Sequence, residues 1–401
     1  MINAGDTAFV LISAALVAVM TPGLAFFYGG LVKRKNVLTI MMQSFISMGV
    51  VTVLWALFTF SLAFGDDFHG LIGNFKYAFM HGVGLDSVAS YGPHIPFLAF
   101  FVFQMMFAII TPALITGAFA DRMNFKSYLL FLVFWSVLIY APLAHWVWGG
   151  GLIASLGALD FAGGTVVHIS AGMAALASVF VLGKRKHTAH LPHNIPYVAL
   201  GTALLWFGWY GFNAGSALGA TPQAAAAFAN TDIAASVAMV TWLALSWLVD
   251  KRPSMVGSLT GVLAGLVAIT PAAGYVQPWA SLVIGILASV VCFYAIKFRM
   301  KMGWDDALDV WGCHGVGGIV GSILTGVFAS KAIGGVSGWI EGNPGQFLAN
   351  LEGTLISIVF AFTATFLLLK ILKQFMTFEI VTKEETEGLD RALHGEEAYD
   401  F

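Results

Sequence analysis

Apolar runs long enough to cross a lipid bilayer dominate this chain. A membrane-spanning helix needs about 20 predominantly apolar residues, and we identify eleven such runs, at residues 7–32, 37–64, 97–120, 127–148, 162–182, 196–217, 230–250, 254–273, 279–298, 308–328 and 350–376. The composition agrees, because 59% of the residues are hydrophobic and 10% are charged, against about 25% charged in soluble domains. We therefore predict an all-α integral membrane protein with eleven transmembrane helices.

The basic residues are distributed unevenly between the two sides of these spans. An odd number of spans places the two termini on opposite sides of the membrane. Of the 19 Lys and Arg residues, only Lys76 and Lys331 fall on one side, and the other 17 fall on the connections and tail of the other. Because cytoplasmic connections carry an excess of Lys and Arg, we predict an outside amino terminus and a cytoplasmic carboxyl tail.

Several classes of protein are disfavoured. No basic residue precedes the first apolar run, so we interpret that run as a retained span and not as a cleaved signal. The two cysteines, Cys292 and Cys313, lie inside predicted spans without CxxC spacing, which indicates buried small residues and neither a disulfide framework nor a zinc site. With a net charge of −2, nucleic acid is not an expected partner. We expect no cofactor and no bound metal.

Two sets of matching motifs suggest an internal repeat. The sequence ITPA occurs at 110–113 and again at 269–272, in the third and eighth spans, and His168 and His314 lie in the fifth and tenth. Five spans per repeat is an odd number, so a second copy enters the membrane with opposite polarity. This predicts an inverted repeat over about 7–182 and 196–328 followed by a last helix, an architecture typical of transporters. The alternative is that short apolar motifs recur by chance.

Ionisable residues at membrane depth are costly and usually face a cavity or a partner. The candidates are His168, His314 and, nearer the cytoplasmic end, Asp309. If the repeat holds, the two histidines lie at matched depths, where one imidazole donates a hydrogen bond and the other accepts it. We interpret the pair as two polar edges of a pore. The alternative is two separate histidines, each bonded to a backbone carbonyl.

The outer end of the fifth span carries Asp160, in a position to cap that helix and to bias the outer mouth toward cations. Aromatic residues occur at the same level of neighbouring spans, where rings hold a partly dehydrated cation or simply form an interfacial belt. These residues, with one serine, are Phe103, Phe107, Trp148, Trp209, Phe212 and Ser216.

At these positions the sequence resembles the Amt/Mep/Rh ammonium transporter family, on its bacterial and archaeal Amt branch. The motifs that carry the resemblance are MTPGLAFFYGGLVKRKN, HWVWGGG, DFAGGTVVHISAG, WFGWYGFNAGSA, DVWGCHGVGG and EGLDRALHGEEAYDF, which cover nearly the whole chain in order. The sequence departs from the family's pattern at Tyr210 and Trp311, where phenylalanine is expected, and in the outer loop 65–96.

The resemblance implies a role for each site residue. An outer recruitment site falls on Trp148, Phe107 and Ser216, with Phe103, Trp209 and the entry acid Asp160 beside it. The gate falls on Phe107 and Phe212, and the pore on His168, His314 and Phe27. Ammonium, or its analogue methylammonium, is expected to lose its proton at the gate and to cross as ammonia, with or without separate proton transfer.

The resemblance further implies a homotrimer in the inner or plasma membrane and a PII-type (GlnK-like) signalling protein as a cytoplasmic partner. Residues 1–376 are then the membrane domain and 377–401 a regulatory tail, whose expected contact residues are Gly388, Leu389, Asp390, His394, Gly395 and Tyr399. By composition alone that tail is a solvated terminus.

Three other functions stay open at this point. An ammonium sensor on the same fold binds the ion with little flux, but about 25 residues after the last span leave little room for a signalling domain. A membrane haem protein could use His168 and His314 as axial ligands. A membrane enzyme is disfavoured, because we find no nucleophile and base in a catalytic pattern.

Overall fold

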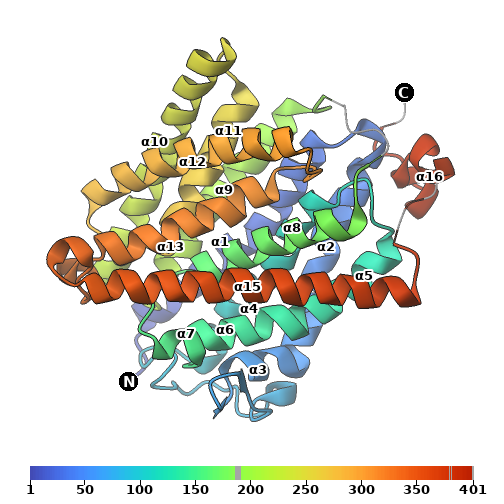
Figure 1. Ribbon diagram of the computed structural model, residues 1–401. Helices are drawn as coiled ribbons and strands as arrows, with labels where there is room; N and C mark the ends of the chain where they lie inside the picture. The colour runs from blue at the N-terminus through green and yellow to red at the C-terminus, as the bar shows by residue number, and fades with distance from the viewer. Residues whose placement is uncertain (186–190, 379, 381, 400–401) are drawn as a thin grey trace.

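The long helices of the chain run side by side in one general direction, with the two termini at opposite ends of the molecule (Figure 1). The computed structural model describes residues 1–185, 191–378, 380 and 382–399. The remaining residues, which belong to a predicted cytoplasmic connection and to the tail, lie outside this part. The described part is almost entirely helical, as expected for an integral membrane protein.

Nine helical segments of the described residues are long and apolar enough to cross a membrane. Several consist of an α-helix continued by a short π or 3-10 segment (η). They are α1 (Ala4–Leu31); η1, α2, η2 and α3 (Arg34–Asn36, Val37–Leu54, Trp55–Thr59, Phe60–Phe64); α4 and η4 (Phe97–Ile115, Thr116–Ala118); α5, η5, α6 and α7 (Phe125–Trp135, Ser136–Tyr140, Ala141–Trp148, Leu152–Ser155); η6 and α8 (Gly164–Ile169, Ser170–Leu182); α10 (Pro222–Asp250); α12 (Pro278–Met302); η7 and α13 (Trp311–Gly315, Val316–Phe328); and α15 (Pro344–Phe375).

The other two predicted spans correspond to α9 (Ile195–Gly215) and α11 (Met255–Ile269). Neither is among the nine, and α11 has only 15 residues, fewer than the roughly 20 that a perpendicular crossing needs. Two helices also begin earlier than predicted. Helix α10 starts at Pro222 and α15 at Pro344, where proline at the first helical position starts the helix ahead of the strongly apolar residues.

Short elements occupy the connections at the end of the molecule where the chain begins. The loop 65–96 contains a two-stranded antiparallel ribbon, β1 (Asp67–Phe68) and β2 (Ile72–Gly73), and the 3-10 turn η3 (Ala78–Met80). This ribbon is the one departure of the described part from the all-α prediction. Helix α14 (Lys331–Gly334) and η8 (Trp339–Glu341) join α13 to α15.

Glycine residues bring two pairs of helices into backbone contact. A Cβ on Gly201 of α9 would lie 2.2 Å from the backbone nitrogen of Phe27 in α1. A Cβ on Gly172 of α8 would lie 2.1 Å from the Cα of Gly315 in η7. Small residues are what permits such close approach inside a membrane, where lipid supplies no hydrophobic drive between helices. The second contact places the segments that carry the two predicted pore histidines directly against each other.

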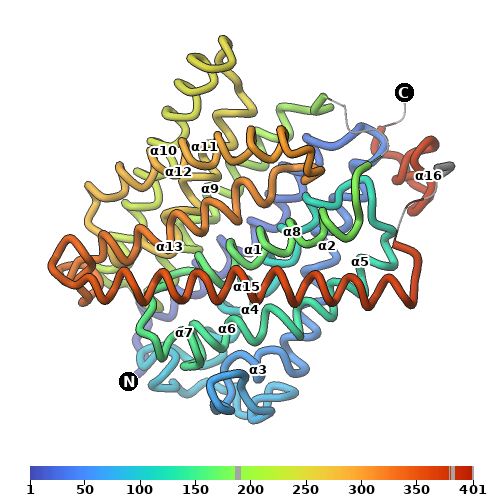
Figure 2. Tube along the Cα trace, in the orientation of Figure 1, coloured from blue at the N-terminus to red at the C-terminus, as the bar shows by residue number. Residues whose placement is uncertain are grey.

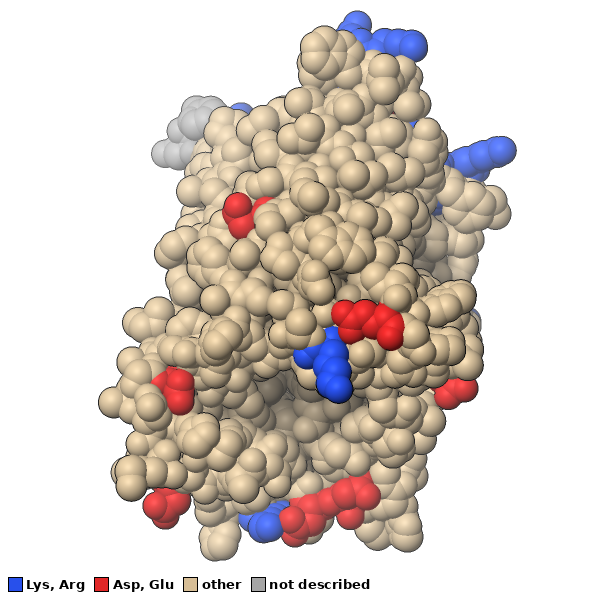
Figure 3. Space-filling model, turned by 90° about the vertical axis from the view of Figure 1, so that its left-hand side faces the viewer, with Lys and Arg blue, Asp and Glu red and all other residues tan. Residues whose placement is uncertain are grey.

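The tail follows α15 back across one end of the molecule. The trace in Figure 2 places α16 (Thr382–Glu387) at the end opposite the amino terminus. The short segment η9 (Asp390–His394) packs against the start of α2. The opposite face, where α1 begins, carries few charged groups and is hollowed near its centre (Figure 3).

Candidate functional site

Three aromatic rings from three different helices meet near the end of the bundle where the chain begins. Trp148 is the last residue of α6, Phe107 lies in α4 and Phe212 in α9. The centroids of Phe107 and Phe212 are 4.3 Å apart with the rings tilted by 40°, and Trp148 meets Phe107 edge to face at 5.8 Å. Both phenylalanines are buried, whereas Trp148 is half-buried. The two buried phenylalanines therefore pack directly beneath a half-buried tryptophan.

Ser216 and Phe103 lie beside these rings in different ways. The Ser216 hydroxyl donates a hydrogen bond of 2.9 Å to the carbonyl oxygen of Phe212, which leaves the lone pairs of the hydroxyl oxygen able to accept from a cation. Phe103 is completely buried and packs edge to face on Phe107 at 5.0 Å. Phe103 thus supports the ring of Phe107 from behind.

Asp160 caps the start of η6 with its carboxylate. The two oxygens accept the backbone N–H groups of Gly163, Gly164 and Thr165 at 2.7–2.8 Å, and also the Thr165 hydroxyl. The N-cap position predicted for Asp160 belongs to Gly163, which has a φ of +113°, and Asp160 reaches the helix from three residues upstream. Its backbone oxygen accepts the indole N–H of Trp148 at 3.1 Å, so this cap and Trp148 are connected.

His168 and His314 lie directly against each other in the centre of the bundle. Their Nδ1 atoms are 3.2 Å apart, and the two rings are nearly parallel, at 25°. One Nδ1 must donate and the other accept. The Nε2 of His168 has no hydrogen-bond partner within the part of the chain that the structure describes. Each histidine lies in a π-helical segment, η6 or η7, and such segments often occur at functional sites.

Trp209 lies deeper than the recruitment group in which it was predicted. Its ring stacks on His168 with centroids 5.4 Å apart, and its indole N–H donates to the Thr270 hydroxyl at 2.8 Å. The Thr270 hydroxyl in turn donates to the carbonyl oxygen of Leu266. Trp209 is therefore fixed as a wall at the level of the histidine pair.

Below Phe212, the histidines border a narrow hollow of about 10 Å³, about the least that holds one water molecule. Apart from the two imidazoles its walls are mainly apolar, and they include Met20, Leu24, Phe27, Ile110, Leu114, Val167, Leu205 and Leu263. A wider cavity of about 220 Å³ follows on the far side of His314, where Phe27, Tyr28, Asp309 and Cys313 form part of the wall. This wider cavity lies toward the end of the molecule that carries the tail.

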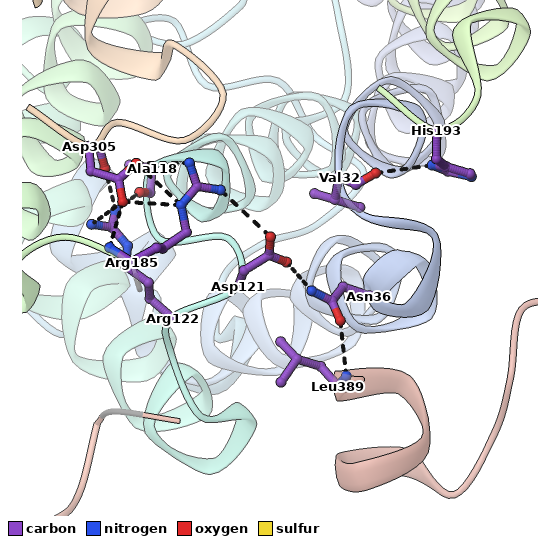
Figure 4. A network of polar contacts seen from close by, with 9 residues as sticks. All are labelled: Val32, Asn36, Ala118, Asp121, Arg122, Arg185, His193, Asp305 and Leu389. Atoms are coloured by element: carbon purple, nitrogen blue, oxygen red, sulfur yellow. Dashed lines mark hydrogen bonds and ion pairs between the residues drawn. The ribbon is translucent and has the colours of Figure 1, made fainter. Parts of the chain in front are cut away.

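A network of charged side chains ties together the helix ends around this opening (Figure 4). Arg185 after α8 forms an ion pair of 2.8 Å with Asp305, which precedes η7. Arg122 after η4 donates to the backbone oxygen of Asp305 at 2.6 Å and also reaches the carbonyl oxygens of Ala118 and Gly183. Burial lowers the pKa of Arg122 to about 10, so that it remains charged at neutral pH. These contacts hold together the ends of the helices that carry Phe107, His168 and His314.

The tail residues are fastened to the same end of the molecule. The Asp390 carboxylate accepts the backbone N–H groups of Leu38 and Thr39 and the Thr39 hydroxyl at 2.8–2.9 Å, which caps α2. The backbone N–H of Leu389 donates to Asn36, whose side chain donates to Asp121. The tail is thereby connected to the charged network (Figure 4).

The remaining predicted tail residues have separate contacts. Gly388 and Gly395 adopt φ values of +109° and +69°, which favour glycine. The His394 ring meets Phe125 edge to face at 5.1 Å. The Tyr399 hydroxyl contacts His193 at 3.0 Å.

Sequence reasoning missed Tyr28 and gave no role to Asp309. Tyr28 borders both the hollow and the wider cavity, and its hydroxyl donates to the carbonyl oxygen of Leu114 at 2.8 Å. Asp309, which the sequence placed among the ionisable residues at membrane depth without a role, has a φ of +58° and pairs with Arg299 at 2.5 Å. Tyr28 sits within an apolar run without periodicity, so no sequence signal marks it. For Asp309 the available signal was a charged residue inside the predicted span 308–328.

The haem alternative can be weighed against this geometry. A haem with both histidines as axial ligands needs an iron and a porphyrin plane between them, and Nδ1 atoms 3.2 Å apart leave no room for either. Among the residues that the structure describes, no group of three or more His, Cys, Asp or Glu side chains is arranged to hold a metal ion.

Comparison with known sequences gives a consistent result over nearly the full chain. Residues 8–399 match the profile described as Ammonium Transporter Family. An "Ammonium transporter" of Bacillus subtilis (strain 168) is 49% identical over 98% of this chain and 98% of that protein. "Ammonium transporter Amt1" of Archaeoglobus fulgidus is 42% identical over 98% of this chain and 99% of that protein.

Solved structures agree with the sequence comparison. Saccharomyces cerevisiae Mep2 superposes with a TM-score of 0.89 at 33% identity, covering 95% of this chain and 88% of that one. A structure described as "Sensor Amt Protein" gives a TM-score of 0.90 at 29% identity, covering 97% and 98%.

Proposed function

The chain belongs to the ammonium transporter family, and we propose that it gathers ammonium at its outer aromatic site, removes a proton and conducts ammonia past the two histidines. Ammonium transport by a multi-pass membrane protein is the premise, given relatives of this identity that are themselves named ammonium transporters. The steps below are the proposal.

One observation carries the mechanism, namely an unbroken series of rings from the outer end to the centre. The centroid separations are 5.8 Å from Trp148 to Phe107, 4.3 Å from Phe107 to Phe212 and 6.0 Å from Phe212 to His168. His168 then meets His314, which borders the wider cavity. A substrate that moves along this series passes from ring faces that favour cations to nitrogens that bond a neutral base.

The outer site suits a small cation that keeps some of its own hydrogen bonds. Trp148 and Phe107 offer aromatic surfaces, each of which attracts a cation by about 0.5–2 kcal/mol. The free lone pairs of Ser216 accept one N–H of the ion. Because the Asp160 carboxylate is occupied by its four hydrogen bonds, we assign it an electrostatic and structural role and no direct contact with the substrate.

Free energies favour loss of the proton before the narrow hollow. Moving a bare monovalent cation into a low-dielectric interior costs on the order of 20 kcal/mol in the idealised limit. Removing a proton at pH 7 from an amine whose pKa is about 10 costs roughly 4–5 kcal/mol. Potassium has no proton to give up, so the same passage excludes it.

Flux measurements in reconstituted vesicles test this mechanism. We expect transport of ammonium and of methylammonium, and no potassium flux above that of protein-free vesicles. The size of the hollow supports slower passage of methylammonium, because the extra methyl group must also pass the Phe107–Phe212 contact. Potassium currents comparable with ammonium currents would rule out deprotonation as the basis of selectivity.

We infer the membrane topology from matched elements of the two halves. The first ITPA segment, 110–113, lies at the end of α4. The second, 269–272, lies where α11 ends and the following turn begins, and the two segments are at opposite ends of the molecule. The first precedes Gly117, which packs near Val310, whereas Pro271 of the second packs against Gly164. This supports an inverted repeat with eleven spans. Nine of these spans are the long apolar segments described above, and α9 and α11 are the other two. We place the amino terminus outside and the tail in the cytoplasm of a cell or inner membrane.

An oligomer, which we propose to be a homotrimer, is supported by a carboxylate on the outer surface of the bundle. Asp232 lies in the first half of α10 and is half-buried, with the Tyr210 hydroxyl donating to it at 2.5 Å. An ionised group facing lipid at this depth is costly. A neighbouring subunit that covers α10 removes that cost, and Tyr210, one of the departures from the family's pattern, supplies part of the required hydrogen bonding.

We propose that the docked tail forms part of the surface that a PII-type protein binds. The variant Asp390→Ala removes the cap of α2, and the loss of an N-cap carboxylate costs about 0.5–2 kcal/mol. We expect the tail to become protease-sensitive and capture of a PII protein in pull-down experiments to fall. Truncation after Lys383 should abolish capture. Asp250→Ala, on the distant end of α10, is the control and should leave capture unchanged; equal capture by all these proteins would contradict the role of the tail.

The similarity to a sensor protein does not favour sensing here. That structure is 29% identical to this chain, whereas the relatives named ammonium transporters reach 49%. Transport therefore remains the function that we propose.

A further inference from the structure

His145, in the last turn of α6, is completely buried, yet both of its ring nitrogens face hydrogen-bond acceptors. Nδ1 lies 2.9 Å from the carbonyl oxygen of Ala63, and Nε2 lies 2.8 Å from a carboxylate oxygen of Asp67. A neutral imidazole has one N–H donor and one acceptor nitrogen. It can satisfy only one of these contacts, and the other would set two lone pairs against each other. A ring that carries both protons satisfies both.

The partner of this ring is held in its ionised form. The Asp67 carboxylate also accepts the backbone N–H of Gly70, at 2.9 and 3.0 Å, and its side chain is 43% exposed, so it stays partly hydrated. The hydrogen bond from His145, followed by that from Gly70, lowers the pKa of Asp67 below its ordinary value. His69 on the same ribbon also acts on Asp67. The surrounding helices α3, α6 and α7 bring no other charged side chain.

We propose that His145 is an imidazolium that clamps the outer ribbon β1–β2 to the end of α6, and that this clamp positions Trp148 in the outer cation site. His145 is then a positioning residue for transport. The second half of this inference rests on the proposed function, because the role of Trp148 is assigned there.

The ribbon and the end of α6 are joined by further hydrogen bonds around the clamp. The indole N–H of Trp146 donates to the carbonyl oxygen of Leu71 at 2.7 Å. The backbone N–H of Leu152 donates to the carbonyl oxygen of Gly70 at 2.9 Å. The backbone N–H of Gly151 donates to the carbonyl oxygen of His145 itself at 3.0 Å. The ribbon therefore contacts the residues on both sides of Trp148.

Two glycines, Gly149 and Gly151, allow the backbone to pack closely against the His145 ring. A Cβ on Gly149 would lie 2.2 Å from the carbonyl oxygen of Ala63 and 2.5 Å from Nδ1 of His145. A Cβ on Gly151 would lie 2.8 Å from the carbonyl oxygen of Gly70 and 3.0 Å from the His145 ring. The backbone that follows α6 can wrap around the imidazole because both positions lack a side chain. No solvent reaches the ring to replace either acceptor.

The clamp reaches the outer site through one helical turn. Trp148 follows His145 by three residues and ends α6, so any rotation of that last turn moves the indole relative to Phe107. The indole N–H has one hydrogen-bond partner, the backbone oxygen of Asp160, and that bond alone does not fix the orientation of the helix end. The ribbon supplies the other fixed point.

The charge state can be read directly by solid-state NMR of the intact protein in lipid vesicles with ¹⁵N-labelled histidine. The His145 signals are identified by their loss in His145→Asn. We expect both ring nitrogens of His145 to be protonated at pH 7.5, and only one in Asp67→Asn, in which an amide replaces the carboxylate. A ring with a single proton in the unmodified protein would overturn the proposal.

The positioning role is measured by transport and by hydrogen exchange. In Asp67→Asn we expect the half-saturating ammonium concentration to rise about fivefold, the size expected for weakening one cation–π contact, with the maximal rate within about twofold. Exchange of the Gly151 and Leu152 amides should accelerate. Asp67→Glu should restore most of both properties. Asp66→Asn, which removes the exposed ion pair with Lys76 and the long contact from the Asn74 amide but no contact to His145, is the matched control and should leave both unchanged.

Trp148→Leu separates failure of the clamp from failure of the outer site. If Trp148→Leu raises the half-saturating concentration and Asp67→Asn does not, the positioning role of His145 is wrong while the proposed function stands. If neither variant changes it, the assignment of Trp148 to the outer site fails, and the positioning role fails with it. The doubly protonated ring and the faster amide exchange would in that case still establish the charged clamp.

Discussion

Replacing both His168 and His314 by leucine is expected to lower ammonium transport at least about 100-fold while the protein remains folded. The two imidazoles are the main polar side chains that border the narrow hollow, and Nε2 of His168 has no protein partner among the described residues. Without them, ammonia crosses this stretch with no hydrogen bonds. An unsatisfied polar group in an apolar interior costs about 2–7 kcal/mol, and about 3 kcal/mol already corresponds to 100-fold in rate.

The measurement is initial flux into vesicles, with folding checked by gel filtration and thermal unfolding. Leucine is close to histidine in volume, so the surrounding helices need not rearrange. Ile169→Val, beside His168 in the same π-helical segment, is the matched control, and it should transport normally because a single buried methyl group costs only about 0.5–1.5 kcal/mol of stability. Normal rate and selectivity in the double variant would remove the histidines from the mechanism.

The second large effect is expected from a single methyl group. In Gly172→Ala the new Cβ would lie 2.1 Å from both the Cα and the backbone nitrogen of Gly315, and 3.0 Å from the carbonyl carbon of His314. All three atoms are backbone and cannot rotate away, so α8 and η7 must separate. We expect a loss of about 1–3 kcal/mol of stability or more. Transport should be largely lost, because the same separation stretches the 3.2 Å contact between the histidines.

The same substitution elsewhere in the chain provides the control. Gly49 lies on an exposed position of α2, and a Cβ there would meet nothing within 4 Å. Gly49→Ala should therefore leave transport unchanged and stabilise the helix by about 0.5–1 kcal/mol, because alanine is the better helix former. Unfolding temperature and flux are measured for both variants side by side. If Gly172→Ala matches Gly49→Ala in both, the close crossing is not required.

The long apolar runs were predictable because length and hydropathy alone distinguish them. Their edges agree with the structure best where a charged or proline-containing turn follows, as at Leu182 and Asp250. Helix α11 was predicted to be longer than it is, because the apolar residues after Ile269 form a turn in which alanine and proline no longer continue the helix. Hydropathy does not distinguish an apolar turn from an apolar helix.

The candidate site was predictable where a residue is unusual for its surroundings. Histidine within an apolar run and aspartate at its start stand out, so His168, His314 and Asp160 could be proposed from the sequence. The depth of an aromatic residue could not be predicted from the sequence. Trp209 was assigned to the outer group, although it stacks on His168. The ribbon in loop 65–96 and its contact with His145 also gave no signal, because that contact joins residues 78 positions apart.

The sequence by itself determined that this chain is a helical membrane protein, because the cost of burying polar groups in lipid restricts which segments can span. The resemblance of its motifs determined the family. Only the tertiary structure decided which side chains meet: the crossing at Gly172 that joins the histidines, the reach of Asp160 to the next helix and the acceptors on both sides of His145. These contacts depend on how segments far apart in the sequence pack at the scale of an ångström. Hydropathy along a chain contains no information about the distance between two such segments.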